Sequence, residues 1–304
     1  TEIYTTYDTL SLHDALPIST RFAETAQAHR VCAPMGMREQ LTFYPEPLAA
    51  IEAAPARSNL DGFVFGKDVG GNEFWQLHWF DLASRETTLL TDGKARNQGP
   101  LFSHDGRQFA WSSTARNGKD TDVWVMDFAT RKPRVLVAEG GQWNAMDFSP
   151  DGRELLVMKY VSAAESYPGV VDLATGKLTM FPVDGGKASL KDFKYSPDDR
   201  GVYYISDEPV DGKPQEFLTL RHHDPKSGKL THISTCFGTH HLMFAEDANN
   251  TLWTSGGGSV VGWLNTKMYE ATGDEEKSQG WTALIIDTNG NGKRDDYVEP
   301  NQPV

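Results

Sequence analysis

Residues 147–158 read DFSPDGRELLVM, and this stretch organises the chain because it recurs in altered form on both sides. Upstream, residues 101–111 read LFSHDGRQFAW, and downstream, residues 193–204 read FKYSPDDRGVYY. The serines of the three copies stand 46 and 47 residues apart. A fixed period in the forties is typical of an architecture that repeats one supersecondary unit.

Each copy has the pattern of two strands joined by a tight turn. An aromatic residue directly before the serine indicates a short strand that ends at Ser149 in the central copy. Asp151-Gly152 then supplies the positive φ that a tight hairpin turn requires. The apolar run 155–158 predicts the next strand, which is buried between sheets.

Aspartates that close apolar strands form a second series with a similar period. Asp81, Asp127, Asp172 and Asp224 stand 46, 45 and 52 residues apart. Each opens a turn into a last strand, for example residues 177–181, so one unit holds four strands. These strands, with no helical period between them, predict an all-β fold: an incomplete β-propeller of about five to six four-stranded blades.

The composition excludes several classes of protein. With 304 residues and 38% hydrophobic content, the chain can bury a sizeable core. Its net charge of −13 argues against a nucleic acid partner, which requires clustered Lys and Arg. Cys32 and Cys236 are its two cysteines, too few for a disulfide framework. No apolar run reaches the ~18 residues of a membrane-spanning helix, and both a periplasmic and a cytoplasmic location fit the sequence.

Residues 1–20 do not match the repeat. Residues 11–18 read SLHDALPI, which resembles the translated sequencing-adapter tails at the ends of assembled fragments. We therefore expect a non-native or disordered tail over residues 1–20, and the alternative is a native, poorly ordered terminus. The regular propeller blades are expected to occupy residues 21–233.

Three further motifs carry a resemblance to a known family. Residues 38–43 read REQLTF, residues 69–73 read VGGNE, and residues 203–208 read YYISDE. With the serine–aspartate turns, these motifs make residues 21–233 resemble the propeller of the prolyl oligopeptidase family, especially its dipeptidyl- and acylaminoacyl-peptidase branches. They resemble the TolB-like propellers more loosely. In the peptidase family the propeller caps an α/β-hydrolase domain and filters substrates by size.

The resemblance implies a function without a catalytic residue in this chain. A nucleophile elbow requires Gly-x-Ser-x-Gly, and the nearest string, residues 257–261, reads GGSVV and fails at its last position. We therefore expect the substrate-gating propeller of a prolyl oligopeptidase-type serine peptidase. It would meet its peptide substrate through a hydrolase domain that is missing from this chain. The alternative is a TolB-like or lyase-like propeller that acts as a protein- or ligand-binding module.

Residues 234–304 follow a different pattern. Where a serine–aspartate turn is due, residues 242–255 read LMFAEDANNTLWTS, which resembles virginiamycin B lyase-like or NHL-type blades. Two explanations fit: the blades diverge within one propeller, or the chain is a chimera joined near residues 224–230. Residues 234–304 are therefore expected to form divergent or chimeric propeller blades.

A candidate calcium loop lies in this last part of the chain. Residues 287–296 read DTNGNGKRDD, with oxygen ligands at alternate positions and Gly at the sixth, as in a loop that wraps calcium. The candidate metal ligands are Asp287, Asn289, Asn291, the Lys293 carbonyl and Asp295. Val298 stands where the closing acid belongs, and the alternative is an Asn-Gly hairpin turn. Calcium is the cofactor that the sequence suggests.

Other polar residues suggest sites less specifically. Glu275-Glu276 could bind a substrate ammonium, as paired glutamates do in some members of the family that the chain resembles, but a solvated turn is the better interpretation. His222-His223 and His240-His241 could ligate a metal. Because neighbours on a strand point to opposite faces, each histidine pair offers at most one ligand. His78 and Asp122 are candidates to line a central funnel.

Overall fold

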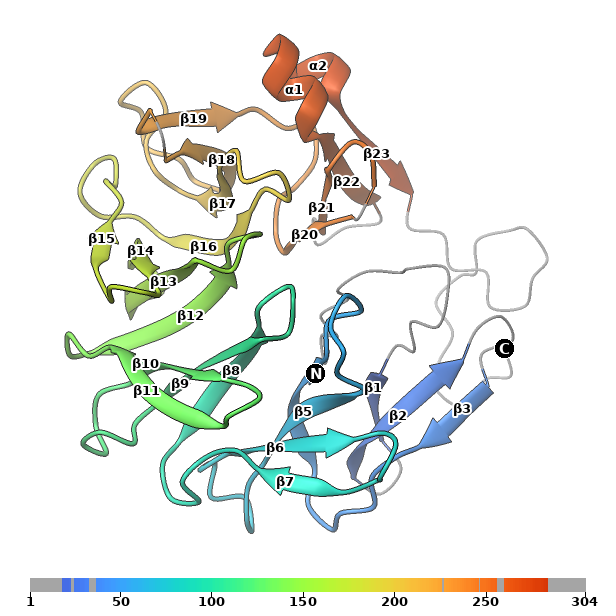
Figure 1. Ribbon diagram of the computed structural model, residues 1–304. Helices are drawn as coiled ribbons and strands as arrows, with labels where there is room; N and C mark the ends of the chain where they lie inside the picture. The colour runs from blue at the N-terminus through green and yellow to red at the C-terminus, as the bar shows by residue number, and fades with distance from the viewer. Residues whose placement is uncertain are drawn as a thin grey trace.

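Strands arranged around one axis make up most of the structure. The computed structural model describes residues 18–22, 25–32, 37–225, 227–245, 247–255 and 260–283. These residues form six antiparallel sheets, five of four strands and one of three. Figure 1 shows the sheets side by side around a common centre. The predicted all-β propeller of about five to six blades is therefore confirmed.

The sheets follow one another along the chain without exchanging strands. The first sheet holds β1 (Ile18–Phe22), β2 (Ala26–Cys32) and β3 (Met37–Gln40). The second holds β4 (Leu48–Ala53), β5 (Gly62–Lys67), β6 (Gln76–Asp81) and β7 (Thr87–Leu89). The third holds β8 (Asn97–Phe102), β9 (Gln108–Ser113), β10 (Asp122–Asp127) and β11 (Lys132–Val137).

The remaining three sheets complete the described part of the ring. The fourth holds β12 (Gln142–Phe148), β13 (Glu154–Ser162), β14 (Glu165–Asp172) and β15 (Leu178–Met180). The fifth holds β16 (Leu190–Tyr195), β17 (Val202–Ser206), β18 (Thr219–Asp224) and β19 (Lys229–Ile233). The sixth holds β20 (Leu242–Phe244), β21 (Thr251–Ser255), β22 (Val260–Asn265) and β23 (Gln279–Ala283). Two helices, α1 (Thr266–Thr272) and α2 (Glu275–Ser278), connect β22 to β23.

Apolar clusters at the junctions between neighbouring sheets hold the ring together. The described residues form one such cluster at each of five junctions. Between the second and third sheets, the Trp79 ring meets Phe102 and Phe128 edge to face, at centroid distances of 6.2 and 5.1 Å. On β10, Val125 packs toward the fourth sheet and the adjacent Met126 packs toward the second. An inner sheet is therefore apolar on both faces and requires two neighbours.

The serine–aspartate turns join the first and second strands of the third, fourth and fifth sheets. The serine Oγ donates to the Oδ1 of the aspartate two residues on, at 2.7 Å from Ser103, 2.8 Å from Ser149 and 2.5 Å from Ser196. The residue after this aspartate has a φ of 70°, 68° and 58° in the three copies. It is glycine in the first two and Asp199 in the third, and aspartate tolerates this conformation better than most residues. The turns predicted from the sequence are confirmed.

The second series of aspartates closes the turn between the third and fourth strands. The aspartate Oδ1 accepts from the backbone N–H three residues on, at 2.7 Å for Asp81, 2.8 Å for Asp127, 2.7 Å for Asp172 and 3.4 Å for Asp224. These bonds favour the ionised carboxylate and lower the pKa of Asp81, Asp127 and Asp172. In an antiparallel sheet both turn types lie at the same end, so the repeated acids gather on one face of the ring as turn residues.

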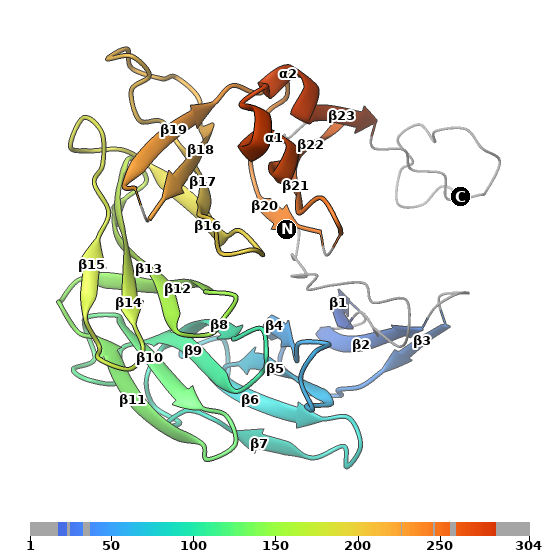
Figure 2. The same ribbon diagram turned by 45° about the horizontal axis from the view of Figure 1, so that its top comes forward.

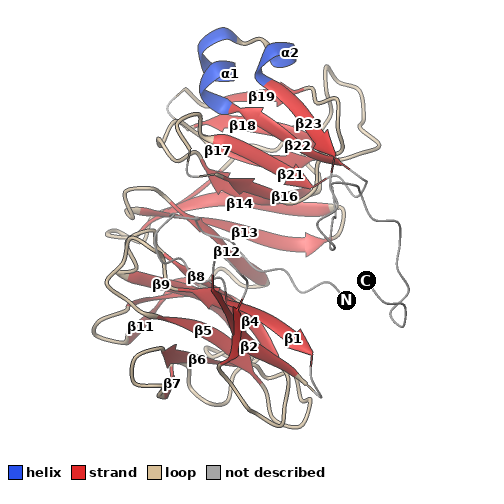
Figure 3. Ribbon diagram, turned by 90° about the vertical axis from the view of Figure 1, so that its right-hand side faces the viewer, coloured by secondary structure: helices blue, strands red, loops and turns tan. Residues whose placement is uncertain are grey.

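The sixth sheet departs from the repeat in both turns. In its first turn the Asp247 carboxylate accepts from the N–H and the hydroxyl of Thr251, at 2.9 and 2.6 Å. In place of the other turn stand α1 and α2, drawn in blue at one end of the molecule in Figure 3. Asn265 caps α1, and Glu270 of α1 accepts from the Tyr203 hydroxyl at 3.0 Å, so the helix docks on the fifth sheet.

The junction between the fifth and sixth sheets is built like the others, from buried apolar side chains of both sheets. The expected divisions of the chain at residues 20 and 233 stay predictions. Neither helix in the described ranges is long and apolar enough to cross a membrane.

Two adjacent histidines of β18 lie in different junctions. The His222 ring is 4.6 Å from the Tyr203 ring, and the His223 ring is 4.4 Å from the Phe181 ring. Tyr203 belongs to the cluster shared with the sixth sheet, and Phe181 to the cluster shared with the fourth. Burial lowers the pKa of both histidines, that of His222 to about 4.

Truncation of a junction side chain should destabilise the ring far more than truncation of a surface side chain. Phe109 is fully buried and its ring lies 5.0 Å from that of Phe102, whereas Phe217 is 73% exposed. We expect Phe109→Ala to lower the unfolding free energy by about 3–5 kcal/mol and Phe217→Ala by less than about 0.5 kcal/mol. Urea unfolding followed by tryptophan fluorescence measures both changes. Equal shifts of the two midpoints would contradict the buried junction.

Acid should destabilise the ring through His222. The pKa of His222 is about 4 in the folded protein, against 6.5 for an unperturbed histidine. The unfolded chain therefore binds more protons, and stability falls as the pH drops from about 6.5 toward about 4. On lowering the pH from 7 to 5, the parent protein should lose about 2 kcal/mol more than His222→Gln. Urea unfolding at both pH values measures the losses, and an equal loss in both proteins would show that His222 is not buried in its neutral form.

Candidate functional site

The innermost strands of five sheets meet around the axis of the ring. Each is the first strand of its sheet, and each lies beside the next around the ring: β4, β8, β12, β16 and β20. Figures 1 and 2 show these strands nearest the centre, with the outer strands directed away from it. Side chains from several sheets converge at such an axis, so we expect a ligand site there.

Four of these strands are interrupted at a matching place by a β-bulge. The pairing shifts between Ala49 and Ile51, Gln98 and Leu101, Ala145 and Asp147, and Lys191 and Lys194. The backbone φ at three bulge residues is positive, 44° at Ala50, 59° at Gly99 and 52° at Asp192. A bulge leaves a residue out of the ladder and changes the direction of neighbouring side chains. Regular pairing is therefore interrupted on the innermost strands of four successive sheets.

Polar side chains gather beside these bulges. Ala50 and Gly99 are exposed although they lie on innermost strands, so solvent reaches the axis. We define the axial polar cluster as Gln98, Asn144, Asp192, His240 and His241. The first three come from innermost strands and are half-buried, and the two histidines come from the loop that leads into β20.

An amide pair joins the third sheet to the fourth within this cluster. The Gln98 Nε2 donates to the Asn144 Oδ1 at 3.2 Å. Within the described ranges neither side-chain amide has a further hydrogen-bond partner, which leaves the Gln98 Oε1 as an acceptor and the Asn144 Nδ2 as a donor. One donor and one acceptor match the C=O and N–H of a peptide backbone.

An imidazole and a carboxylate meet on the next two sheets. The His241 Nδ1 lies 3.7 Å from the Asp192 Oδ2, and these side chains are 42% and 30% exposed. The His240 ring packs edge-on against the His241 ring at a centroid distance of 4.1 Å. The contact offers an imidazole and a carboxylate to a ligand at the axis.

The repeat spacing carries a signal for two of the five residues of this cluster. Gln98 and Asn144 stand 46 residues apart, each five residues before the serine of its copy, and Lys191 holds the same place in the third copy. Three polar residues at one repeat position indicate a common environment at the solvent-exposed axis. No spacing connects Asp192 with His241, because His241 belongs to the divergent sixth sheet.

The predicted calcium ligands Asp287, Asn289, Asn291, Lys293 and Asp295 lie outside the described residues, so the calcium loop stays a prediction. Among the residues that the structure does describe, no group of three or more His, Cys, Asp or Glu side chains is suited to hold a metal ion.

His78 and Asp122 do not line a central funnel. Both lie on the third strand of a sheet, two strands away from the axis. His78 stacks on Phe65 with ring centroids 5.3 Å apart. Asp122 is fully buried and accepts from the Arg116 guanidinium at 2.6 and 3.0 Å, so it holds the loop between β9 and β10.

The two histidine pairs differ in their settings. His222 and His223 face different junctions, as neighbours on a strand should. His240 and His241 lie in a loop, where adjacent rings can contact each other. The alternation rule therefore separates the first pair and does not apply to the second.

Glu275 and Glu276 begin helix α2, so the predicted solvated turn is wrong. Asp274 caps the helix by accepting from the Lys277 N–H at 3.0 Å. Acidic residues in a first turn stabilise a helix through its dipole. The Glu275 Oε1 also accepts from the Ser234 N–H at 3.0 Å, which ties α2 to the loop after β19.

Comparison with known proteins finds a relative in sequence. No family model matches the chain. Atu1656, an uncharacterized protein of Agrobacterium fabrum, is 26% identical over 171 residues, which cover 50% of this chain and 57% of that protein. This chain thus spans little more than half the length of the curated relative that it matches.

Solved structures of several propellers resemble this one. TolB from Acinetobacter baumannii has a TM-score of 0.58 at 14% identity, over 86% of this chain and 61% of that chain. Oligogalacturonate lyase from Vibrio parahaemolyticus has 0.62 at 14% identity, over 89% and 75%. A prolyl endopeptidase has 0.55 at 15% identity, over 79% and 36%. At these identities the likeness shows the fold: a β-propeller like those of TolB, the lyase and the peptidase.

Proposed function

We propose that this chain is a non-catalytic β-propeller that binds peptide at its axis, as the substrate-gating part of a prolyl oligopeptidase-type serine peptidase. The observation that carries the proposal is the Gln98–Asn144 amide pair, which bridges the third and fourth sheets beside their bulges. A gating propeller requires recognition at its axis, because that is where a substrate passes toward the hydrolase domain.

The chemistry of the amide pair suits a peptide. The Gln98 Oε1 can accept from a peptide N–H while the Asn144 Nδ2 donates to a peptide C=O, the pairing that a strand offers to an added strand. Both groups are neutral, so they recognise the backbone whatever the charge of its side chains. Asp192 on the next sheet supplies an acceptor for a peptide ammonium or N–H.

Two of the structural neighbours support the proposal. The chain matches 36% of the prolyl endopeptidase and 43% of a puromycin hydrolase, so in both enzymes the likeness is confined to part of a longer chain. In the proposal, hydrolysis belongs to a separate domain and this chain selects what reaches it.

Exposed apolar side chains favour a second candidate function. Phe43, Val69 and Phe217 are 77%, 68% and 73% exposed, and Phe74, in the same loop as Val69, is 48% exposed. All four lie in connections between strands. Large apolar side chains exposed in this way are candidates for contacts with a partner protein. A TolB-like propeller that binds a partner protein through its loops is therefore the alternative.

Peptide binding should depend on the amide pair. Calorimetric titration of the purified chain with an uncharged, blocked, proline-containing tetrapeptide should show saturable binding. The double variant Gln98→Ala/Asn144→Ala should bind about tenfold more weakly, since it loses two hydrogen bonds of about 0.5–1.5 kcal/mol each. Gln215→Ala changes a half-buried glutamine in the loop between β17 and β18, and this matched control should bind like the parent.

The same preparation should leave dipeptidyl and aminoacyl chromogenic substrates intact. Turnover that a serine-reactive phosphonate abolishes would overturn the non-catalytic role. Unchanged affinity in the double variant would place peptide recognition away from the axis. Failure of the parent to bind any tetrapeptide would favour the partner-binding alternative.

A further inference from the structure

A groove between the third and fourth sheets contains none of the axial residues. It is a cavity of about 520 Å³, formed where the turns of the two sheets face each other. The lining residues that matter are Asp127, Lys132, Arg134, Arg153, Asp172 and Leu173. A cavity of this size accommodates a ligand of a few residues, since small-molecule sites measure about 300–1,000 Å³.

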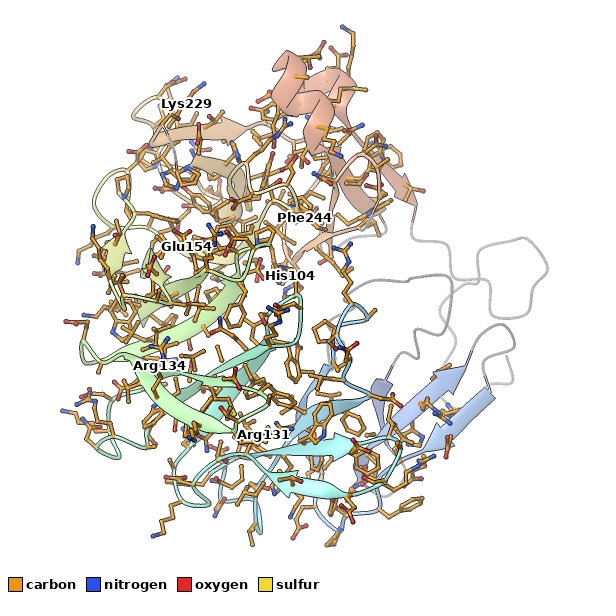
Figure 4. All side chains as sticks on the ribbon, viewed as in Figure 1. His104, Arg131, Arg134, Glu154, Lys229 and Phe244 are labelled. Carbon is orange, nitrogen blue, oxygen red and sulfur yellow. The ribbon has the colours of Figure 1, made fainter. Side chains whose placement is uncertain are left out.

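Three cations line this groove in a chain with a net charge of −13. Lys132 forms no ion pair with any described residue. The Arg134 Nη2 donates to the carbonyl of Leu173 at 2.6 Å, which fixes the guanidinium across the groove without neutralising it. Figure 4 labels Arg134 on the outer strand β11, beside the fourth sheet. Arg153 lies 3.4 Å from Asp151 in its own turn, with its side chain 83% exposed, and such exposed pairs are weak.

Two aspartates add hydrogen-bond acceptors to the same groove. Asp127 and Asp172 accept turn N–H groups at 2.8 and 2.7 Å, and these bonds lower the pKa of both carboxyls. Both groups are therefore ionised at neutral pH. Leu173, which is buried, contributes an apolar side chain to the lining of the groove.

We propose that this groove binds an extended acidic peptide. Side-chain carboxylates of the peptide pair with Lys132 and Arg134, and its backbone N–H groups donate to Asp127 and Asp172. An inorganic anion offers no such donors, and the two aspartates repel it. A peptide satisfies both sets of groups at once. The site lies apart from the axial polar cluster and does not depend on the function proposed for that cluster.

Fluorescence anisotropy with a labelled pentapeptide of alternating glutamate and alanine tests the site. Binding to the parent should weaken as salt is added. Lys132→Glu should weaken it about tenfold while keeping the urea midpoint of the parent, because the Lys132 side chain is exposed. Arg134→Gln should also weaken it. Lys119→Glu makes the same charge change in the exposed loop between β9 and β10, at the other end of the sheet, and should leave the affinity unchanged.

A second peptide with glutamine in place of glutamate should bind at least about tenfold more weakly than the acidic one. Equal affinity for the two peptides, equal effects of Lys132→Glu and Lys119→Glu, or no binding to the parent would each overturn the proposal. Inorganic phosphate and unlabelled peptide are then compared as competitors of the labelled peptide. If phosphate displaces the labelled peptide at a lower concentration than unlabelled peptide does, the groove binds a simple anion and the proposal is overturned as well.

Discussion

The structure depends on sheets that bury apolar side chains on both faces. In the fifth sheet the adjacent residues Tyr203 and Tyr204 are buried in two different junctions, as Val125 and Met126 are in the third. Each fully buried large side chain contributes about 1.5–3 kcal/mol. A junction that holds eight buried apolar side chains outweighs any single polar contact in the molecule. A ring gives every inner sheet the two neighbours that it needs.

Burial of both faces of each inner sheet limits the positions at which a side chain can contact a ligand. Apolar side chains of the junctions cover the faces of the inner sheets. Polar side chains therefore lie mainly at the inner edge of each sheet and in the turns. Most turn acids are used to close the turns: Asp127 and Asp172 both hold a backbone N–H. At the inner edge the bulges interrupt regular pairing, and polar side chains such as Gln98 and Asn144 stand there instead. The residues at the axis and in the groove that keep unused hydrogen-bonding or charge capacity are therefore the candidates for ligand contacts.

The parts of the structure that depend on local chemistry could be predicted from the sequence. The turn at Ser149 and the strand after it are determined by neighbouring residues. The recurrence of this turn and strand along the chain predicts the propeller. The bulges could not be predicted, because Ala50, Gly99 and Asp192 share a positive φ but no residue type. Helix α1 could not be predicted because seven residues are too few for a periodic signal, which leaves its caps, Asn265 and Gly273, as local signs. The finer assignment to a peptidase is proposed from the amide pair at the axis together with sequence motifs that lie elsewhere in the chain.

The junction between the third and fourth sheets positions polar groups of both candidate sites. The Gln98–Asn144 bond crosses from β8 to β12 at the axis, and the Arg134–Leu173 bond crosses between the same two sheets at the groove. Between them lies one apolar cluster that contains Phe148 and Leu155, both fully buried. Close-packed side chains of this kind resist displacement, so the polar groups at either end are already held before a ligand arrives. Less ordering is then required on binding, which favours affinity from a small number of contacts. The same rigidity implies that a ligand at one site leaves the sheets in place at the other, so the two sites should act independently.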